Sequence, residues 1–119
     1  MDYKLGIVIL HVNDLGKARD FYTNTLNLPI IEPLSDEHFL TLQLGANQIG
    51  ISNAPNVKPQ VGSTELGLEV KDVDDVYATW QKQGVTLLTS PQDFPFGRAF
   101  DAQDPEGHRL NVYKLRSRN

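Results

Sequence analysis

One pattern occurs twice along this chain. Residues 10–15 read Leu-His-Val-Asn-Asp-Leu, and residues 68–73 read Leu-Glu-Val-Lys-Asp-Val at the matching place. Further on, Tyr22 aligns with Trp80. An internal repeat constrains a fold more than composition does, because each copy should form the same small unit. One helix and four strands per copy are too few for an independent core, so we expect the copies to share an interface.

The first copy begins with a strand over residues 4–12, where branched apolar residues dominate. Asp14 is a candidate helix N-cap, and apolar residues at helical spacing predict a helix that ends near Asn27. Three further strands are predicted over residues 28–32, 37–44 and 48–52. The segment 53–62 contains Pro55, Pro59 and Gly62 and is predicted to be a linker.

The second copy follows the same order. A strand is predicted over residues 65–70, and Asp72 is the N-cap of a helix that ends at Gly84. Strands are predicted over residues 85–89, 97–102 and 108–115, with a proline-containing loop over residues 90–95. The prediction is an α+β fold in one domain of 119 residues: module one over 4–52, the linker over 53–62 and module two over 63–115.

Composition narrows the possible partners. The chain has no cysteine, which excludes disulfides, thiolate metal sites and cysteine nucleophiles. Its net charge of −4 argues against nucleic acid, since phosphate backbones are bound by positively charged surfaces. The apolar run over residues 5–10 is too short to cross a membrane, so we expect a cytoplasmic protein with no membrane partner.

Two segments carry a family resemblance. Residues 12–22 read Val-Asn-Asp-Leu-Gly-Lys-Ala-Arg-Asp-Phe-Tyr. Gly97-Arg98 is followed by residues 104–110, which read Asp-Pro-Glu-Gly-His-Arg-Leu. In this order and inside a repeat, they resemble the vicinal-oxygen-chelate superfamily of glyoxalases, bleomycin-resistance proteins and extradiol dioxygenases. The resemblance implies two tandem βαβββ modules that form a cup-shaped mixed sheet, a ligand on the concave face and a homodimer.

The resemblance also implies where a metal would bind. The positions that match the ligand positions of the metal enzymes are Ile7, Gly50, Glu65 and Asn111. Only Glu65 is a usual ligand for a divalent ion, and such sites need about three His or carboxylate groups. We therefore expect no metal and no other cofactor.

Alternation along the strands sorts their side chains between two faces. The apolar set predicted to pack against the helices is Val8, Leu10, Val12, Leu66, Leu68, Val70, Leu110 and Val112. The opposite face carries mixed side chains. The candidate ligand-binding residues are His11, Phe39, Glu65, Glu69, Phe96, Arg98, Asn111 and Tyr113.

Several candidates allow more than one interpretation. The repeat superposes His11 on Glu69, which indicates an acid–base pair, a charged ligand anchor or a satisfied polar pair. Glu65 and Glu69 would attract a cationic ligand or remain solvated. Phe96, together with Phe94, would form an aromatic rim or pack locally. Arg98 would bind an anionic group or serve the fold.

The function predicted from these residues is metal-independent binding of a small molecule, such as an antibiotic or another bulky cationic or aromatic compound. One alternative is a metal-dependent lyase, isomerase or dioxygenase with relocated ligands at His11, Glu65 and Glu69. A second alternative is a metal-free acid–base enzyme that uses His11.

Overall fold

The computed structural model describes residue 2, residues 4–59 and residues 64–116. The chain divides into two compact units, unit one over residues 1–60 and unit two over residues 61–119. This boundary lies within the predicted linker, of which residues 60–62 are outside the described residues. The division agrees with the repeat, and each unit is described separately below. Within the described part of the chain, no helix is long and apolar enough to cross a membrane.

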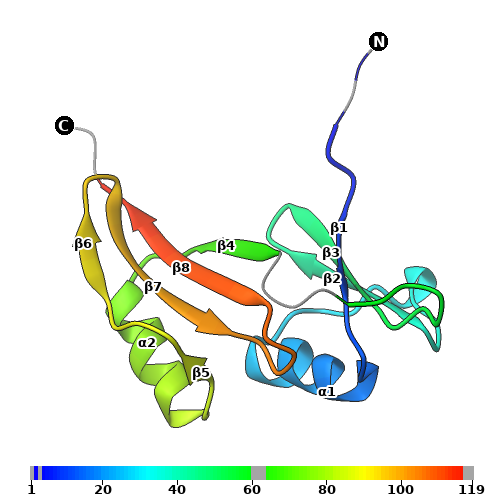
Figure 1. The fold of residues 1–119 in the computed structure, drawn as a ribbon. Helices are drawn as coiled ribbons and strands as arrows, with labels where there is room; N and C mark the ends of the chain where they lie inside the picture. The colour runs from blue at the N-terminus through cyan, green and yellow to red at the C-terminus, as the bar shows by residue number, and fades with distance from the viewer. Residues whose placement is uncertain (1, 3, 60–63, 117–119) are drawn as a thin grey trace. The chain divides into compact units, whose positions relative to one another are not determined.

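Unit one contains a three-stranded sheet (Figure 1). Its strands are β1 (Val8–His11), β2 (Phe39–Leu44) and β3 (Asn47–Ser52), in the order β1-β3-β2. β1 is parallel to β3, and β2 is antiparallel to β3. Gly45 has a φ of 59°, which explains why glycine stands in the short turn between β2 and β3.

The helix of unit one begins where the sequence predicts. α1 (Leu15–Asp20) is capped by Asp14, whose Oδ1 accepts a hydrogen bond from the Lys17 backbone N–H at 3.0 Å. The chain continues into a π-helical turn over Phe21–Thr25. Tyr22 in this turn is fully buried, and its ring meets that of Phe21 edge to face. Asn27 then takes a φ of 58°, a left-handed conformation that ends the helical segment.

The prediction of a strand over residues 28–32 is wrong. The structure has a single bridge there, between Ile30 and Leu42, followed by a 3₁₀ turn over Glu32–Leu34. The Pro29 carbonyl accepts from Gln43, but Pro29 has no N–H to donate. Prolines at residues 29 and 33 therefore limit the pairing to one bridge.

Unit two contains a larger sheet in the order β4-β8-β7-β5, with β6 also paired to β7. Its strands are β4 (Glu65–Glu69), β5 (Thr86–Leu87), β6 (Gln92–Phe94), β7 (Gly97–Gln103) and β8 (Arg109–Leu115). β4 is parallel to β8, whereas β8, β5 and β6 are antiparallel to β7. The short strand β6 lies inside the segment 90–95 that was predicted to be a loop, so that part of the prediction is wrong.

α2 (Val73–Lys82) packs on one face of the unit-two sheet (Figure 1). Asp72 caps it by accepting a hydrogen bond from the Asp75 backbone N–H at 3.0 Å, as predicted. Its Tyr77 and Trp80 rings meet Phe100 of β7 edge to face, with centroid distances of 5.1 and 5.6 Å. These three aromatic residues pack α2 against β7.

The predicted core face is confirmed. Leu10, Val12, Leu66, Leu110 and Val112 are buried, and Val8, Leu68 and Val70 are half-buried. The three strands of unit one have counterparts in unit two, since β1, β3 and β2 correspond in order and direction to β4, β8 and β7. The fold class predicted from the sequence, mixed α+β with two sheets and two helices, is therefore confirmed.

The segment 104–110, the second of the two that carry the family resemblance, has a structural role. Asp104 is buried, and its Oδ1 accepts hydrogen bonds from the backbone N–H groups of Glu106 and His108, both at 2.9 Å. Gly107 has a φ of 89°, and its N–H donates to the Asp104 carbonyl at 3.0 Å. These residues build the turn between β7 and β8.

Candidate functional site

The face of the unit-one sheet that carries His11 is defined here as the unit-one face. His11 of β1 and Phe39 of β2 both lie opposite Ser52 of β3, so two predicted residues share this face. The Phe39 ring lies over Gly50: a Cβ at Gly50 would be 2.5 Å from Phe39 Cζ and 3.2 Å from Ile7 Cδ1. An aromatic and an aliphatic side chain therefore occupy the space beside Gly50.

The face of the unit-two sheet opposite α2 is defined here as the unit-two face. Alternation places on it Glu65, Gly67 and Glu69 of β4, Asp101 of β7, and Arg109, Asn111, Tyr113 and Leu115 of β8. Phe94 of β6 joins them, because it lies opposite Gly97, which lies opposite Leu115. Four predicted ligand-binding residues, Glu65, Glu69, Asn111 and Tyr113, therefore share one face.

One end of the unit-two face is a charged network. Arg109 donates through Nε to Glu65 Oε1 at 3.3 Å and through Nη2 to Asp101 Oδ2 at 2.9 Å. Asn111 donates from Nδ2 to the other oxygen of Asp101, at 2.9 Å. The network links three adjacent strands, β4, β8 and β7.

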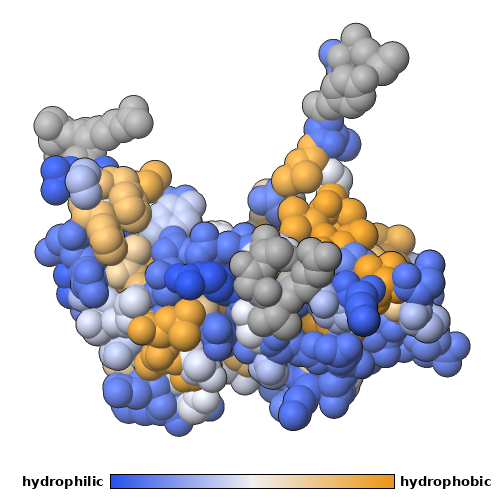
Figure 2. Space-filling view, in the orientation of Figure 1, coloured by the Kyte–Doolittle hydropathy of each residue, from blue (hydrophilic) through white to orange (hydrophobic). Residues whose placement is uncertain are grey.

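The other end of the unit-two face is aromatic. The Tyr113 ring lies over Gly67, where an added Cβ would be 3.3 Å from Tyr113 Cε1. Phe94 and Phe96 stack with centroids 5.4 Å apart and planes 7° apart, and both rings are exposed. These two rings and the exposed side chain of Leu115 on β8 form a hydrophobic patch near the tip of the β6–β7 hairpin, where Figure 2 shows orange.

Glu69 lies directly opposite Tyr113 in the register of β4 and β8. It is exposed, and no ion pair or hydrogen bond of its side chain is found among the residues the structure describes. The aromatic end of the face therefore has a carboxylate beside it. The predicted pairing of Glu69 with His11, which belongs to the other unit, stays a prediction.

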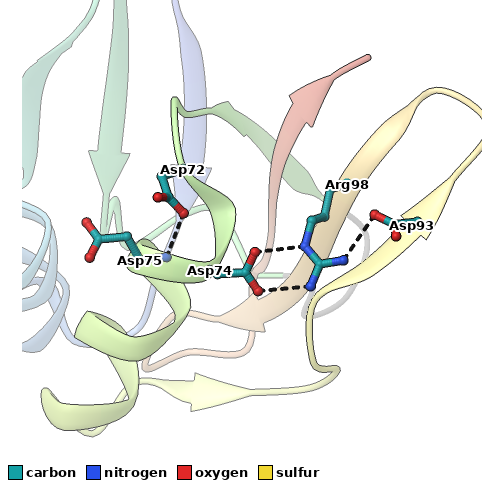
Figure 3. Close-up of polar contacts among 5 residues, drawn as sticks. All are labelled: Asp72, Asp74, Asp75, Asp93 and Arg98. Carbon is teal, nitrogen blue, oxygen red and sulfur yellow. Dashed lines mark hydrogen bonds and ion pairs between the residues drawn. The ribbon is translucent and has the colours of Figure 1, made fainter. Parts of the chain in front are cut away.

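Arg98 is separated from the other candidates. It lies on the α2 side of β7 and donates from Nε and Nη2 to the two oxygens of Asp74, at 2.8 and 2.9 Å (Figure 3). Its Nη1 donates to Asp93 of β6 at 3.0 Å. The structure therefore places Arg98 in a clamp between α2, β7 and β6, and does not bring it onto the unit-two face. This geometry supports the interpretation that Arg98 serves the fold.

The Arg98 clamp predicts a pH dependence of stability. The hydrogen bond from Arg98 holds the pKa of Asp74 below its ordinary value of 3.8. A lowered folded-state pKa adds stability above the unfolded-state pKa, and this contribution is lost as the pH falls through the folded-state value. We expect Asp74→Asn to lower Tm slightly at pH 7 and to have no effect at a pH well below 3.8.

Asp75→Asn is the matched control for this prediction, since Asp74 and Asp75 both lie in the first turn of α2. Both substitutions remove a negative charge from the same helix end, but only Asp74 pairs with Arg98. Thermal unfolding of the three proteins from pH 7 to pH 2.5 gives the comparison. Equal pH profiles for the two variants would show that the ion pair adds nothing beyond the helix-end charge.

The residues at the four family metal positions do not fit a metal. Ile7 and Gly50 offer no side-chain donor, and Phe39 covers the second position. In unit two, Glu65 is paired with Arg109, and Asn111 donates to Asp101. Among the described residues, no group of three or more His, Cys, Asp or Glu could hold a metal ion. The alternative with relocated ligands stays a hypothesis.

Two cavities lie in unit one. One has a volume of about 530 Å³ and is lined in part by Asn13, Arg19 and Glu37. The other, of about 440 Å³, lies along the segment from Val12 to Asn13 and from Asn53 to Pro59. None of the eight predicted ligand-binding residues lines either cavity.

Sequence reasoning missed Asp101 of the unit-two face. Asp101 contacts Arg109 in its charged network, and the register places Phe94 on the same face. The available signal was the charge of Asp101 within an otherwise apolar strand segment, Ala99 to Ala102. Only the register shows that Asp101 lies opposite Asn111.

Residues 4–112 match the family described as the Glyoxalase/Bleomycin resistance protein/Dioxygenase superfamily. The chain belongs to this superfamily. The match covers both units and agrees with the resemblance inferred from the two signatures. Membership establishes the fold, and this fold supports many chemistries, so function has to come from the site.

Three relatives illustrate the likeness. The uncharacterized protein YraH of Bacillus subtilis (strain 168) is 26% identical, and the alignment covers 94% of this chain and 98% of YraH. The anthracycline biosynthesis protein DauV of Streptomyces sp. (strain C5) is 30% identical over 94% of this chain, which spans only 42% of DauV. The solved structure of TnmS3, an antibiotic binding protein from Streptomyces sp. CB03234, is 25% identical with a TM-score of 0.80, over 97% of this chain and 98% of that one.

Proposed function

We propose that this superfamily member binds a planar aromatic compound with a positively charged group, without a metal, on its unit-two face. The observation that carries the proposal is the aromatic end of that face. Exposed Phe94 and Leu115 and the ring of Tyr113 share a face with the exposed carboxylate of Glu69. Aromatic side chains stack on planar ligands, and a carboxylate beside them attracts a cation.

Charge supports the same class of ligand. The unit-two face has three carboxylates, Glu65, Glu69 and Asp101, against one guanidinium, Arg109. The face is therefore negative, like the chain as a whole, which has a net charge of −4. A negative face concentrates cationic compounds and repels anionic ones, including nucleic acid.

The relatives point in the same direction. DauV is described as an anthracycline biosynthesis protein, and TnmS3 as an antibiotic binding protein. An anthracycline is a fused planar ring system with a protonated amino sugar, so it has both features that the unit-two face would recognise. We further propose that the chain works in the cytoplasm as a homodimer.

The proposal is tested by titrating the protein with an anthracycline and following the fluorescence of the compound. Saturable binding is expected, and Tyr113→Ala should weaken it about tenfold, because a stacked ring contact contributes about 0.5–1.5 kcal/mol beyond its buried area. Glu69→Gln should also weaken binding and should make the affinity less sensitive to salt.

The matched control is Glu37→Gln, which removes an exposed carboxylate from unit one. It makes the net charge of the chain less negative by one, as Glu69→Gln does, but leaves the unit-two face intact. A neutral anthraquinone without the amino sugar serves as the second ligand, and it should bind more weakly than the anthracycline. No saturable binding, or equal affinities for the wild type and Tyr113→Ala, would contradict the proposal.

A further inference from the structure

Arg109 lies at the centre of the charged network on the unit-two face. It is on β8, the strand between β4 and β7, and lies opposite Glu65 on one side and Gln103 on the other. Two residues further along β8, Asn111 lies opposite Asp101 of β7. Two carboxylates, Glu65 and Asp101, thus contact one guanidinium, and Asn111 contacts Asp101.

The contacts of Arg109 occupy both carboxylates. Its Nε and Nη2 atoms, which are bonded to the same carbon, reach Glu65 at 3.3 Å and Asp101 at 2.9 Å. Asp101 uses its second oxygen to accept from Asn111 at 2.9 Å. The side chain of Asp101 is only 24% exposed, so it depends on these partners more than Glu65, which is 52% exposed.

The position between Glu65 and Asp101 favours a positive charge. Two carboxylates that face one position repel each other unless a positive charge lies between them. The guanidinium belongs to the chain, so it cannot dissociate from this position as a free ion would. A bound divalent ion would satisfy the same oxygens, so the two are mutually exclusive.

We propose that Arg109 is a built-in counter-ion that excludes divalent cations from the unit-two face. It neutralises Glu65 and Asp101 and fixes their orientation. Removing its charge while keeping the rest of the network leaves the two carboxylates as oxygen ligands with no positive charge between them. Hard divalent ions such as Mn²⁺ bind oxygen sets of this kind.

The test measures Mn²⁺ binding to the purified protein by electron paramagnetic resonance, with MnCl₂ as the only added ligand. Arg109→Ala is expected to bind Mn²⁺ about tenfold more tightly than the wild type or better. Arg109→Lys, which keeps a positive charge at the same place, should resemble the wild type. The double variant Arg109→Ala/Asp101→Asn should lose the gain, because it removes one of the two carboxylates.

Arg109→Met is a second neutral variant that keeps an apolar stem, and it is measured beside Arg109→Ala so that poor folding of one does not decide the result. Wild-type affinity in both neutral variants, or an equal gain in Arg109→Lys, would overturn the proposal. The result does not depend on the proposed ligand: anthracycline binding by the wild type is measured without Mn²⁺, so either proposal can fail alone.

Discussion

Phe100→Ala is expected to lower the free energy of unfolding by about 3–5 kcal/mol. Phe100 is 1% exposed in β7, and its ring receives both Tyr77 and Trp80 of α2 edge to face. Truncation leaves a cavity between helix and sheet and removes both aromatic contacts. A domain of this size is stable by only about 5–15 kcal/mol, so a large part of the total would be lost.

Urea unfolding followed by circular dichroism measures this change. Phe94→Ala is the matched control, because it removes the same side chain from a position that is 40% exposed. Its cost should remain below about 1 kcal/mol. A cost below about 1 kcal/mol for Phe100→Ala as well would mean that the contact between α2 and β7 contributes little to stability.

Gly97→Ala is expected to destabilise the protein by about 3 kcal/mol or more. Gly97 has a φ of 153°, and a Cβ there would lie 2.0 Å from the Lys114 carbonyl oxygen. It would also lie 3.0 Å from the Arg116 backbone nitrogen. The obstructing atoms belong to the backbone of the neighbouring strand, so relief requires β7 and β8 to separate at their paired ends.

Gly6→Ala is the control for this substitution, because a Cβ at Gly6 meets nothing within 4 Å. It should change the free energy of unfolding by less than about 0.5 kcal/mol. Urea unfolding gives both values, and amide hydrogen exchange locates the effect. Gly97→Ala should raise exchange in β7 and β8 first. Wild-type stability in Gly97→Ala would show that the two strands tolerate a wider spacing.

The helices could be predicted from sequence because the residues that determine their starts are close together. Asp14 caps α1 through Lys17, and Asp72 caps α2 through Asp75, each three residues away. The apolar faces follow from spacing alone, and the repeat supplied the same prediction twice. These interactions are local, so they are visible in the sequence before any tertiary contact is known.

The two wrong segments depend on partners elsewhere in the chain. Residues 28–32 have the apolar character of a strand, but Pro29 allows only the bridge from Ile30 to Leu42. Residues 90–95 have the prolines of a loop, yet Gln92–Phe94 pairs with β7 because a tight turn at Pro95 and Phe96 returns the chain. In both cases the neighbouring strand decides the outcome.

The site could be predicted only in part, because some of its residues come together through the pairing of neighbouring strands. Alternation placed Glu65, Asn111 and Tyr113 on one face correctly. Alternation along β7 also puts Arg98 on the other face, but its partner Asp74 is 24 residues away, so nothing local indicated the ion pair. Asp101 became part of the site only through the register of β7 and β8.

The parallel pairing of first and last strands has a consequence for synthesis on the ribosome. β4 contacts β8 across 44 residues, so unit two has no complete sheet until its final strand has been made. β1 pairs with β3 in the same way, and this pairing ends at Ser52. Unit one can therefore complete its sheet while unit two is still being translated. A nascent chain that stops before Arg109 would leave β4 without its partner strand, and an unpaired strand is an aggregation risk that pairing with β8 reduces.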